Sequence, residues 1–137
     1  MRWADQLIKL STFELEVLQT RLAAIVEQRT AAEVRLAVLL AEGEAELAHA
    51  RADPDCGWRM AAFNEALKQR KAKVRGEIDL TAAEEAGARD ALAEAFETLK
   101  KYEQIAENAR VVAARETAKR ETAVLDEMGL RRATGRR

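Results

Sequence analysis

The side chains that most often carry out chemistry are scarce in this chain, which has one histidine, His49, and one cysteine, Cys56. A thiol beside an imidazole could act as a nucleophile, but no arrangement of serine or carboxylate side chains around His49 suggests a catalytic triad. One cysteine and one histidine form neither an intramolecular disulfide nor a structural zinc site. We therefore predict no enzyme, and no catalytic, cofactor-binding or metal-binding residues. We interpret His49 as a solvent-facing side chain near a helix end, where it meets the negative end of the helix dipole.

A basic run over Lys68–Arg75 has five basic residues among eight and could bind nucleic acid or acidic lipid. On a helix these side chains spread around most of the circumference, whereas a nucleic-acid surface is one-sided. The chain has 23 basic and 24 acidic residues and a formal net charge of -1, so it lacks a sustained positive field. It also lacks an apolar run near the roughly 20 residues of a membrane span. We predict no nucleic-acid partner and no direct membrane insertion.

The elements that position these residues are long amphipathic helices. Aromatic residues make up 4% of the chain, too few for the core of a sheet, and alanine, glutamate, arginine and leucine dominate, as in coiled coils. Apolar residues recur at alternating steps of three and four, which are the a and d positions of a heptad. The first stripe contains Leu15, Leu18, Leu22, Ile25, Arg29, Ala32, Leu36 and Leu39, followed, one residue out of phase, by Leu40, Gly43, Leu47 and Ala50. We predict a helix over about 5–51.

The only proline, Pro54, must interrupt this helix, because a proline pushes the residue before it out of the helical region. Either Asp53 caps the second helix with Pro54 in its first turn, or Asp55 and Gly57 form the turn and the helix begins after them. Both alternatives place the turn at about 52–57.

The second helix is predicted over about 58–128, with Gly129 as its end and a flexible basic tail over 129–137. Its stripe contains Phe63, Leu67, Val74, Ile78, Thr81, Glu85, Ala88, Leu92, Ala95, Leu99, Tyr102, Ala106, Ala109 and Ala113. Two long helices joined by a short turn become antiparallel neighbours. The predicted fold class is all-α, an antiparallel two-helix coiled-coil hairpin with an overhanging C-terminal helix, in a single domain over 1–137. Beyond about residue 106 the second helix has no partner in its own chain, and an unaccompanied helix is marginal in water.

The predicted register pairs Leu36 with Val74 and Leu22 with Gly87 or Ala88. We expect Gly87 to leave room for the large Leu22 side chain, whereas Gly43 and Gly76 either pack closely or allow local bending, and these alternatives stay open. Arg29 interrupts the apolar stripe. We predict that it fixes the register by pairing with Glu77 or Glu84 across the contact between the helices.

Large apolar residues also converge near the turn: Leu40, Leu47, Trp58, Phe63 and Leu67. They either plug the end of the helix contact, with Trp58 holding the turn, or stay partly exposed as a binding hot spot. Both interpretations stay open.

The C-terminal segment FETLKKYEQIAENARVVAARETAKRETAVLDEMGLRR (96–132) resembles the last helix of the FliJ family, flagellar type III export chaperones and export-ATPase stalk proteins. That helix ends in a hydrophobic–Asp–Glu–hydrophobic element followed by arginines. The matching residues here are Leu125, Asp126, Glu127 and Met128, then Arg131 and Arg132. The opening ADQLIKLSTFELEVLQTRLAAI (4–25), and Phe63 and Leu67 after Trp58, are also similar to the family.

The resemblance implies a soluble component of the flagellar type III export apparatus, a stalk-like partner of the hexameric export ATPase. It would link that ring to the cytoplasmic domain of the membrane export gate and recycle export chaperones. The implied location is the cytoplasm, with peripheral association to the membrane export apparatus. The implied ATPase-binding residues are Trp3, Leu7, Leu125, Asp126, Glu127, Met128, Arg131 and Arg132. The implied gate-binding residues at the hairpin tip are Leu40, Leu47, Trp58, Phe63 and Leu67. The alternative is a generic coiled-coil scaffold or a homodimerising adaptor whose overhangs pair with one another.

Overall fold

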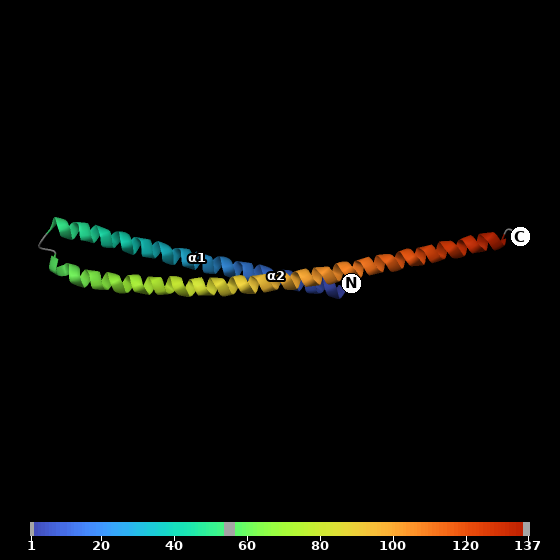
Figure 1. Ribbon diagram of the computed structural model, residues 1–137, viewed down its shortest axis with the longest axis horizontal. Coiled ribbons are helices and arrows are strands. Elements are labelled where there is room, and N and C mark those ends of the chain that lie inside the picture. Colours follow the sequence, from blue (N-terminus) through green and yellow to red (C-terminus); the bar gives the residue numbers. More distant parts are fainter. Residues whose placement is uncertain (1, 54–56, 136–137) are drawn as a thin grey trace. The chain divides into compact units, whose positions relative to one another are not determined.

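A computed structural model describes residues 2–53 and 57–135, which form two helices, α1 (Arg2–Ala52) and α2 (Gly57–Gly135), in chain order (Figure 1). α1 has 51 residues and α2 has 79, and the described part of the chain contains no strand. The predicted all-α fold, an antiparallel helical hairpin, is confirmed. Neither helix, over the residues described, combines the length and the apolar character that a bilayer crossing requires.

The end of α1 lies close to the prediction. The backbone N–H of Asp53 donates a hydrogen bond of 3.1 Å to the carbonyl oxygen of His49, which extends the hydrogen bonding of the last turn by one residue. Residues 54–56 lie outside the described residues, and with them the predicted roles of Pro54 and Asp55. Gly57 is the first residue of α2, so it belongs to the helix and not to a preceding turn.

The predicted stop at Gly129 is wrong, because α2 continues through it to Gly135. No described glycine has a positive φ, so Gly129 adopts ordinary helical backbone geometry. A glycine inside a helix costs about 1 kcal/mol relative to alanine, which weakens a helix without ending it. The Arg131 Nη2 atom lies 2.9 Å from the Glu127 Oε1 atom, and this ion pair at i, i+4 spacing supports the turn that contains Gly129.

The chain divides into two compact units, which are described separately. The first, here called the tip unit, consists of residues 16–93 and contains most of α1 and the start of α2. The second, the terminal unit, contains residues 2–15 of α1 and 94–135 of α2. The single domain predicted over 1–137 stays a prediction.

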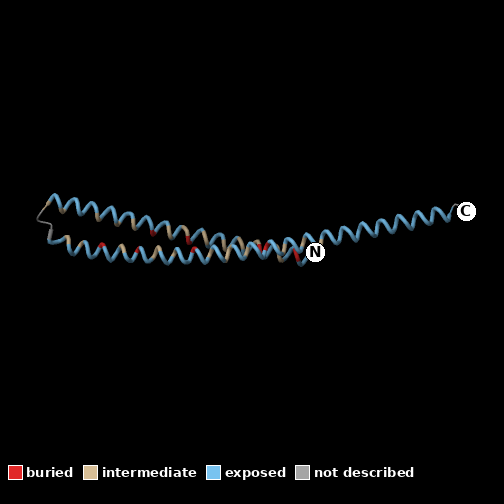
Figure 2. The backbone as a smooth tube through the Cα atoms, in the orientation of Figure 1, coloured by how far each residue is buried: buried red, intermediate tan, exposed pale blue. Residues whose placement is uncertain are grey.

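In the tip unit the two helices contact each other along the predicted heptad stripes, here called the seam (Figure 2). Ile25 and Ala32 of α1 and Leu67 and Val74 of α2 are buried, together with Glu85. The rest of the seam is half-buried and includes Leu18, Leu22, Arg29, Leu36, Leu39, Gly43, Ala50, Phe63, Ile78, Thr81, Ala88 and Leu92. The predicted stripes are therefore largely confirmed.

Two predicted seam positions are wrong, since Leu40 and Leu47 are both exposed. The pattern does not shift at Leu40: the half-buried residues Leu39 and Gly43 continue the steps of three and four from Leu36. A leucine next to a seam position points about 100° away from it on a helix. A prediction based on hydrophobicity alone therefore put these two side chains in the seam, whereas they lie beside it.

In the terminal unit the seam extends closer to the N-terminus than the stripe that begins at Leu15. Ala4 and Ser11 are buried with relative exposures of 1% and 4%, and Leu99 of α2 is buried as well. Half-buried residues complete this seam: Leu7, Ile8, Leu15, Ala95, Tyr102, Ala106 and Ala109. Ala4 and Ser11 carry too little apolar surface to stand out in a sequence, although their small size suits a close helix contact.

Residues 110–135 of α2, here called the overhang, are all exposed (Figure 2). The predicted loss of a helix partner beyond about residue 106 is confirmed, since the last half-buried residue is Ala109, one turn later.

Candidate protein-interaction surfaces

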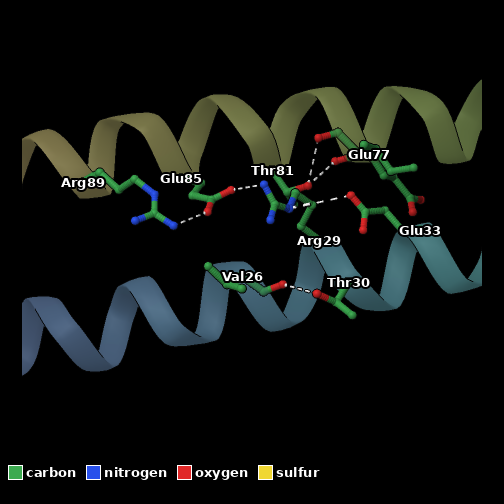
Figure 3. A network of polar contacts seen from close by, with 9 residues as sticks. Val26, Arg29, Thr30, Glu33, Glu77, Thr81, Glu85 and Arg89 are labelled. Atoms are coloured by element: carbon green, nitrogen blue, oxygen red, sulfur yellow. Dashed lines mark hydrogen bonds and ion pairs between the residues drawn. The ribbon is translucent and has the colours of Figure 1, made fainter.

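A cluster of charged side chains lies on the seam of the tip unit (Figure 3). The Arg29 guanidinium of α1 donates a hydrogen bond to Oε2 of Glu85 on α2. The Arg89 guanidinium donates to the other carboxylate oxygen at 2.8 Å. The Glu85 side chain is only 7% exposed, whereas that of Arg29 is 33% exposed. Two guanidinium groups thus neutralise one buried carboxylate, which keeps the burial of its charge tolerable.

Arg29 therefore pairs across the seam as predicted, but its partner is Glu85 and not Glu77 or Glu84. Glu85 occupies a heptad position of α2, so its side chain lies in the seam, whereas Glu84 is exposed. Glu77 pairs with another arginine, since its Oε2 atom lies 2.8 Å from Arg35 Nη2. A buried charge pair of this kind favours one register, because sliding the helices would separate the partners. The cluster is thus a structural feature of the seam, although Arg29, Glu85 and Arg89 also line an open groove of about 370 Å³.

The prediction that Gly87 makes room for Leu22 is wrong. A Cβ atom placed on Gly87 meets nothing within 4 Å, so Leu22 does not fill its space. Gly87 instead lines an open groove of about 440 Å³ with Leu18, Arg21, Ile25, Glu84, Ala88 and Ala91. Leu18 and Ile25 lie one turn before and one turn after Leu22, and they line the same groove as Gly87 and Ala88. This is consistent with the predicted register. The close contact lies at Gly43, where a Cβ atom would come within 2.6 Å of Leu67 Cδ2.

The five residues predicted at the hairpin tip divide into two groups. Leu67 is 8% exposed and packs against Gly43, and Phe63 is half-buried, so both close the seam. Leu40, Leu47 and Trp58 are exposed, Trp58 most of all at 75%. The Arg59 guanidinium lies 4.9 Å from the centre of the Trp58 ring, a cation–π contact that leaves most of the indole open. Leu40, Leu47 and Trp58 thus form the exposed apolar part of the tip.

Two other predicted features lie at the surface. His49 is exposed in the last turn of α1, as predicted. In the basic run, Lys68, Arg70, Lys73 and Arg75 are exposed, while Val74 among them is buried in the seam. The charges therefore surround the solvent side of the helix without forming a one-sided patch.

The overhang carries the predicted C-terminal element, whose Leu125, Asp126, Glu127, Met128, Arg131 and Arg132 are all exposed. At 100° per residue, Leu125 and Met128 share one side of the helix, and Leu130 lies on the opposite side. Val124, which was not among the predicted residues, also lies on the side of Met128, four residues before it. Its i, i+4 spacing was the available signal. The result is an apolar face formed by Val124, Leu125 and Met128, which nothing covers among the described residues.

The other predicted ATPase-binding residues, Trp3 and Leu7, lie at the start of α1 in the terminal unit. Trp3 is 53% exposed and Leu7 is half-buried in the seam. Near them, an open groove of about 620 Å³ is lined by Asp5 and Ile8 of α1 and by residues of α2 that include Ala106, Ala109 and Ala113. The groove marks the place where α1 begins and α2 passes beyond it. Glu103, Glu107 and Arg110 also line this groove, so charged side chains border the small ones.

Two curated proteins are similar to this chain over nearly its whole length. Both are named flagellar FliJ protein and come from two strains of Caulobacter vibrioides. Each is 50% identical over 132 residues, which cover 96% of this chain and 95% of the relative. No family model matches the chain, and no solved structure matches it either.

Proposed function

Because this chain belongs to the FliJ family of flagellar proteins, we propose that it is a stalk-like partner of the hexameric ATPase of the flagellar type III export apparatus. The single observation that carries this proposal is the overhang, in which every residue from 110 to 135 is helical and exposed. A helix without a neighbour is marginal in water. An overhang that keeps an apolar face of Val124, Leu125 and Met128 therefore suits a partner that surrounds it, as the pore of a ring does.

The charges of the overhang support the same role. Its end combines Asp126 and Glu127 with Arg131 and Arg132, so a pore lining of mixed charge can pair with it on several sides. Trp3 lies in the same terminal unit and adds an exposed aromatic residue, the type most often found in binding hot spots.

The tip unit takes the second contact of the proposal. Trp58, with Leu40 and Leu47, offers exposed apolar surface to the cytoplasmic domain of the membrane export gate. Leu67 and Phe63 support this surface from within the seam. Export chaperones are the third class of partner, and the chain acts in the cytoplasm at the periphery of the membrane export apparatus.

The test is binding of the purified hexameric export ATPase to the full chain and to a chain that lacks residues 120–137. We expect the truncation to abolish binding and to leave the thermal melt of the remaining hairpin unchanged, because none of the described residues removed is buried. A matched pair of point variants sharpens the result. Leu125→Asp should weaken binding roughly tenfold as a hot-spot loss, whereas Leu80→Asp, in the same helix and similarly exposed (68% and 62%), should not. Unchanged binding by the truncated chain contradicts the proposed stalk role.

A further inference from the structure

A second heptad stripe runs along α1 in the tip unit, outside the seam. Two of its residues, Val34 and Val38, also line an open groove with Arg70, Lys73 and Val74 of α2. The stripe begins at Val17 and continues at alternating steps of three and four through Ala24, Ala31, Val34 and Val38 to Ala48, and it is here called the outer face. Eight of its ten positions are apolar, the exceptions being Thr20 and Glu27. All ten are exposed, and Val17, Val34 and Val38 are 50% to 57% exposed.

α2 has no equivalent stripe in the tip unit, where its exposed large hydrophobic residues are Trp58 and Leu80. Scattered apolar residues are normal on a protein surface, but a sustained heptad is the pattern that a neighbouring helix requires. α1 therefore has two helix-binding sides. The seam covers one, and the other is open over the residues that the structure describes.

Of the charged side chains beside the outer face, which include Arg35 and Glu44, four indicate what covers it. Glu16, Arg21, Glu42 and Arg51 are exposed, and none of them forms an ion pair among the described residues. We propose that a second copy of this chain packs its outer face antiparallel against this one, with Val17 opposite Ala48 of the second copy. In that register Glu16 lies beside Arg51 of the second copy, and Arg21 lies beside Glu42. A two-fold axis repeats both pairs, as in any isologous interface.

Other arrangements of two outer faces bring like charges together. A slide of one heptad, with Val17 opposite Ala41, puts Glu16 beside Glu44 and Arg21 beside Arg35. A slide in the other direction puts Arg35 beside Arg35 of the second copy, where the ion pair of each with its own Glu77 offsets only part of the repulsion. A parallel in-register pair puts Glu27 directly against Glu27 inside the interface, whereas the proposed register places each Glu27 opposite Val38 of the second copy, away from a like charge. The charges thus select one antiparallel register, and the alanines and valines allow the helix axes to approach to about 8 Å, the close end of the usual range.

This interface is separate from the overhang and from the exposed tip residues, so the inference does not rest on the proposed function. It also differs from a dimer in which two overhangs pair with each other. Because the face is built of small residues, it buries little area for each residue, and we expect a reversible dimer.

The test is sedimentation equilibrium of the full chain over a concentration series. Arg21→Glu should raise the dimer dissociation constant roughly tenfold, because two symmetric attractive pairs become repulsive. Glu42→Arg should act alike, and the double variant Arg21→Glu/Glu42→Arg should restore dimerisation by exchanging the charges. Both side chains are exposed, so the helical circular dichroism spectrum should not change.

Two controls separate this dimer from other assemblies. Removal of residues 120–137 should leave the dissociation constant unchanged, and Arg21→Glu should leave binding of the export ATPase unchanged. A chain that stays monomeric at every concentration overturns the proposal. So does a dimer that the truncation abolishes, or one that the charge exchange fails to restore.

Discussion

Leu67 of α2 occupies the space that a side chain at residue 43 of α1 would need, since a Cβ atom added to Gly43 would lie 2.6 Å from Leu67 Cδ2. The contact lies in the tip unit, where Leu67 is buried and Gly43 is half-buried. The missing side chain of Gly43 thus provides the hole that the Leu67 side chain enters, as a knob does in a coiled coil.

Alanine substitutions at Gly43 and Gly87 should have different effects on stability. Both glycines lie inside helices, where alanine gains up to about 1 kcal/mol in helix propensity. Gly87→Ala should show this gain, because a Cβ atom there meets nothing within 4 Å. Gly43→Ala should gain less or lose stability, because Leu67 must move away. Urea denaturation measures both free energies of unfolding, and an equal gain at the two sites would contradict the Gly43–Leu67 contact.

Removal of the buried carboxylate at Glu85 should destabilise the hairpin. Glu85→Ala leaves the partly buried Arg29 without its partner across the seam, and we expect a loss of about 1–3 kcal/mol in the free energy of unfolding. Arg89→Ala is the control, since Arg89 is exposed and lies on the same helix as Glu85, so its loss should stay below about 1 kcal/mol.

Replacement of both Arg29 and Glu85 distinguishes the cost of an unpaired charge from the cost of a lost packing contact. The double variant Arg29→Leu/Glu85→Leu removes both charges and fills the seam, so it should unfold at the same urea concentration as the unmodified chain or a higher one. A Glu85→Ala variant as stable as the unmodified chain would show that the pair contributes nothing to the hairpin.

Alanine substitutions of Trp58 and Leu67 should distinguish an effect on binding from an effect on the free energy of unfolding. Trp58→Ala should change the free energy of unfolding by less than about 0.5 kcal/mol, because the indole is 75% exposed. The same change should weaken binding to the export-gate domain under the proposed function. Leu67→Ala should instead cost about 2 kcal/mol or more, as truncation of a buried leucine does. Thermal melts and a binding titration of both variants make the comparison, and a large stability loss for Trp58→Ala would contradict its exposed position.

Local patterns predicted the helices, the break between them and most of the seam. The steps of three and four through Ile25, Leu36, Val74 and Leu99 identify the face that each helix buries, because a helical repeat depends only on neighbouring residues. The position of Pro54 predicted where α1 ends, because proline restricts the residue before it. The unequal lengths of the two helices predicted the exposed overhang.

The errors arise where the identity of the opposing residue matters. Leu40 and Leu47 are apolar but lie beside the seam, whereas Ala4 and Ser11 are small and lie within it. Arg29 had several glutamates within reach, and only the packed helices select Glu85. The stop expected at Gly129 failed because glycine weakens a helix without ending it.

By itself, the sequence determined that this protein is two amphipathic helices with one reversal, because periodicity and proline act over a few residues at a time. Only the tertiary structure decided which glycine receives a leucine and which carboxylate is buried. Both depend on how side chains from distant parts of the chain fill the same small space.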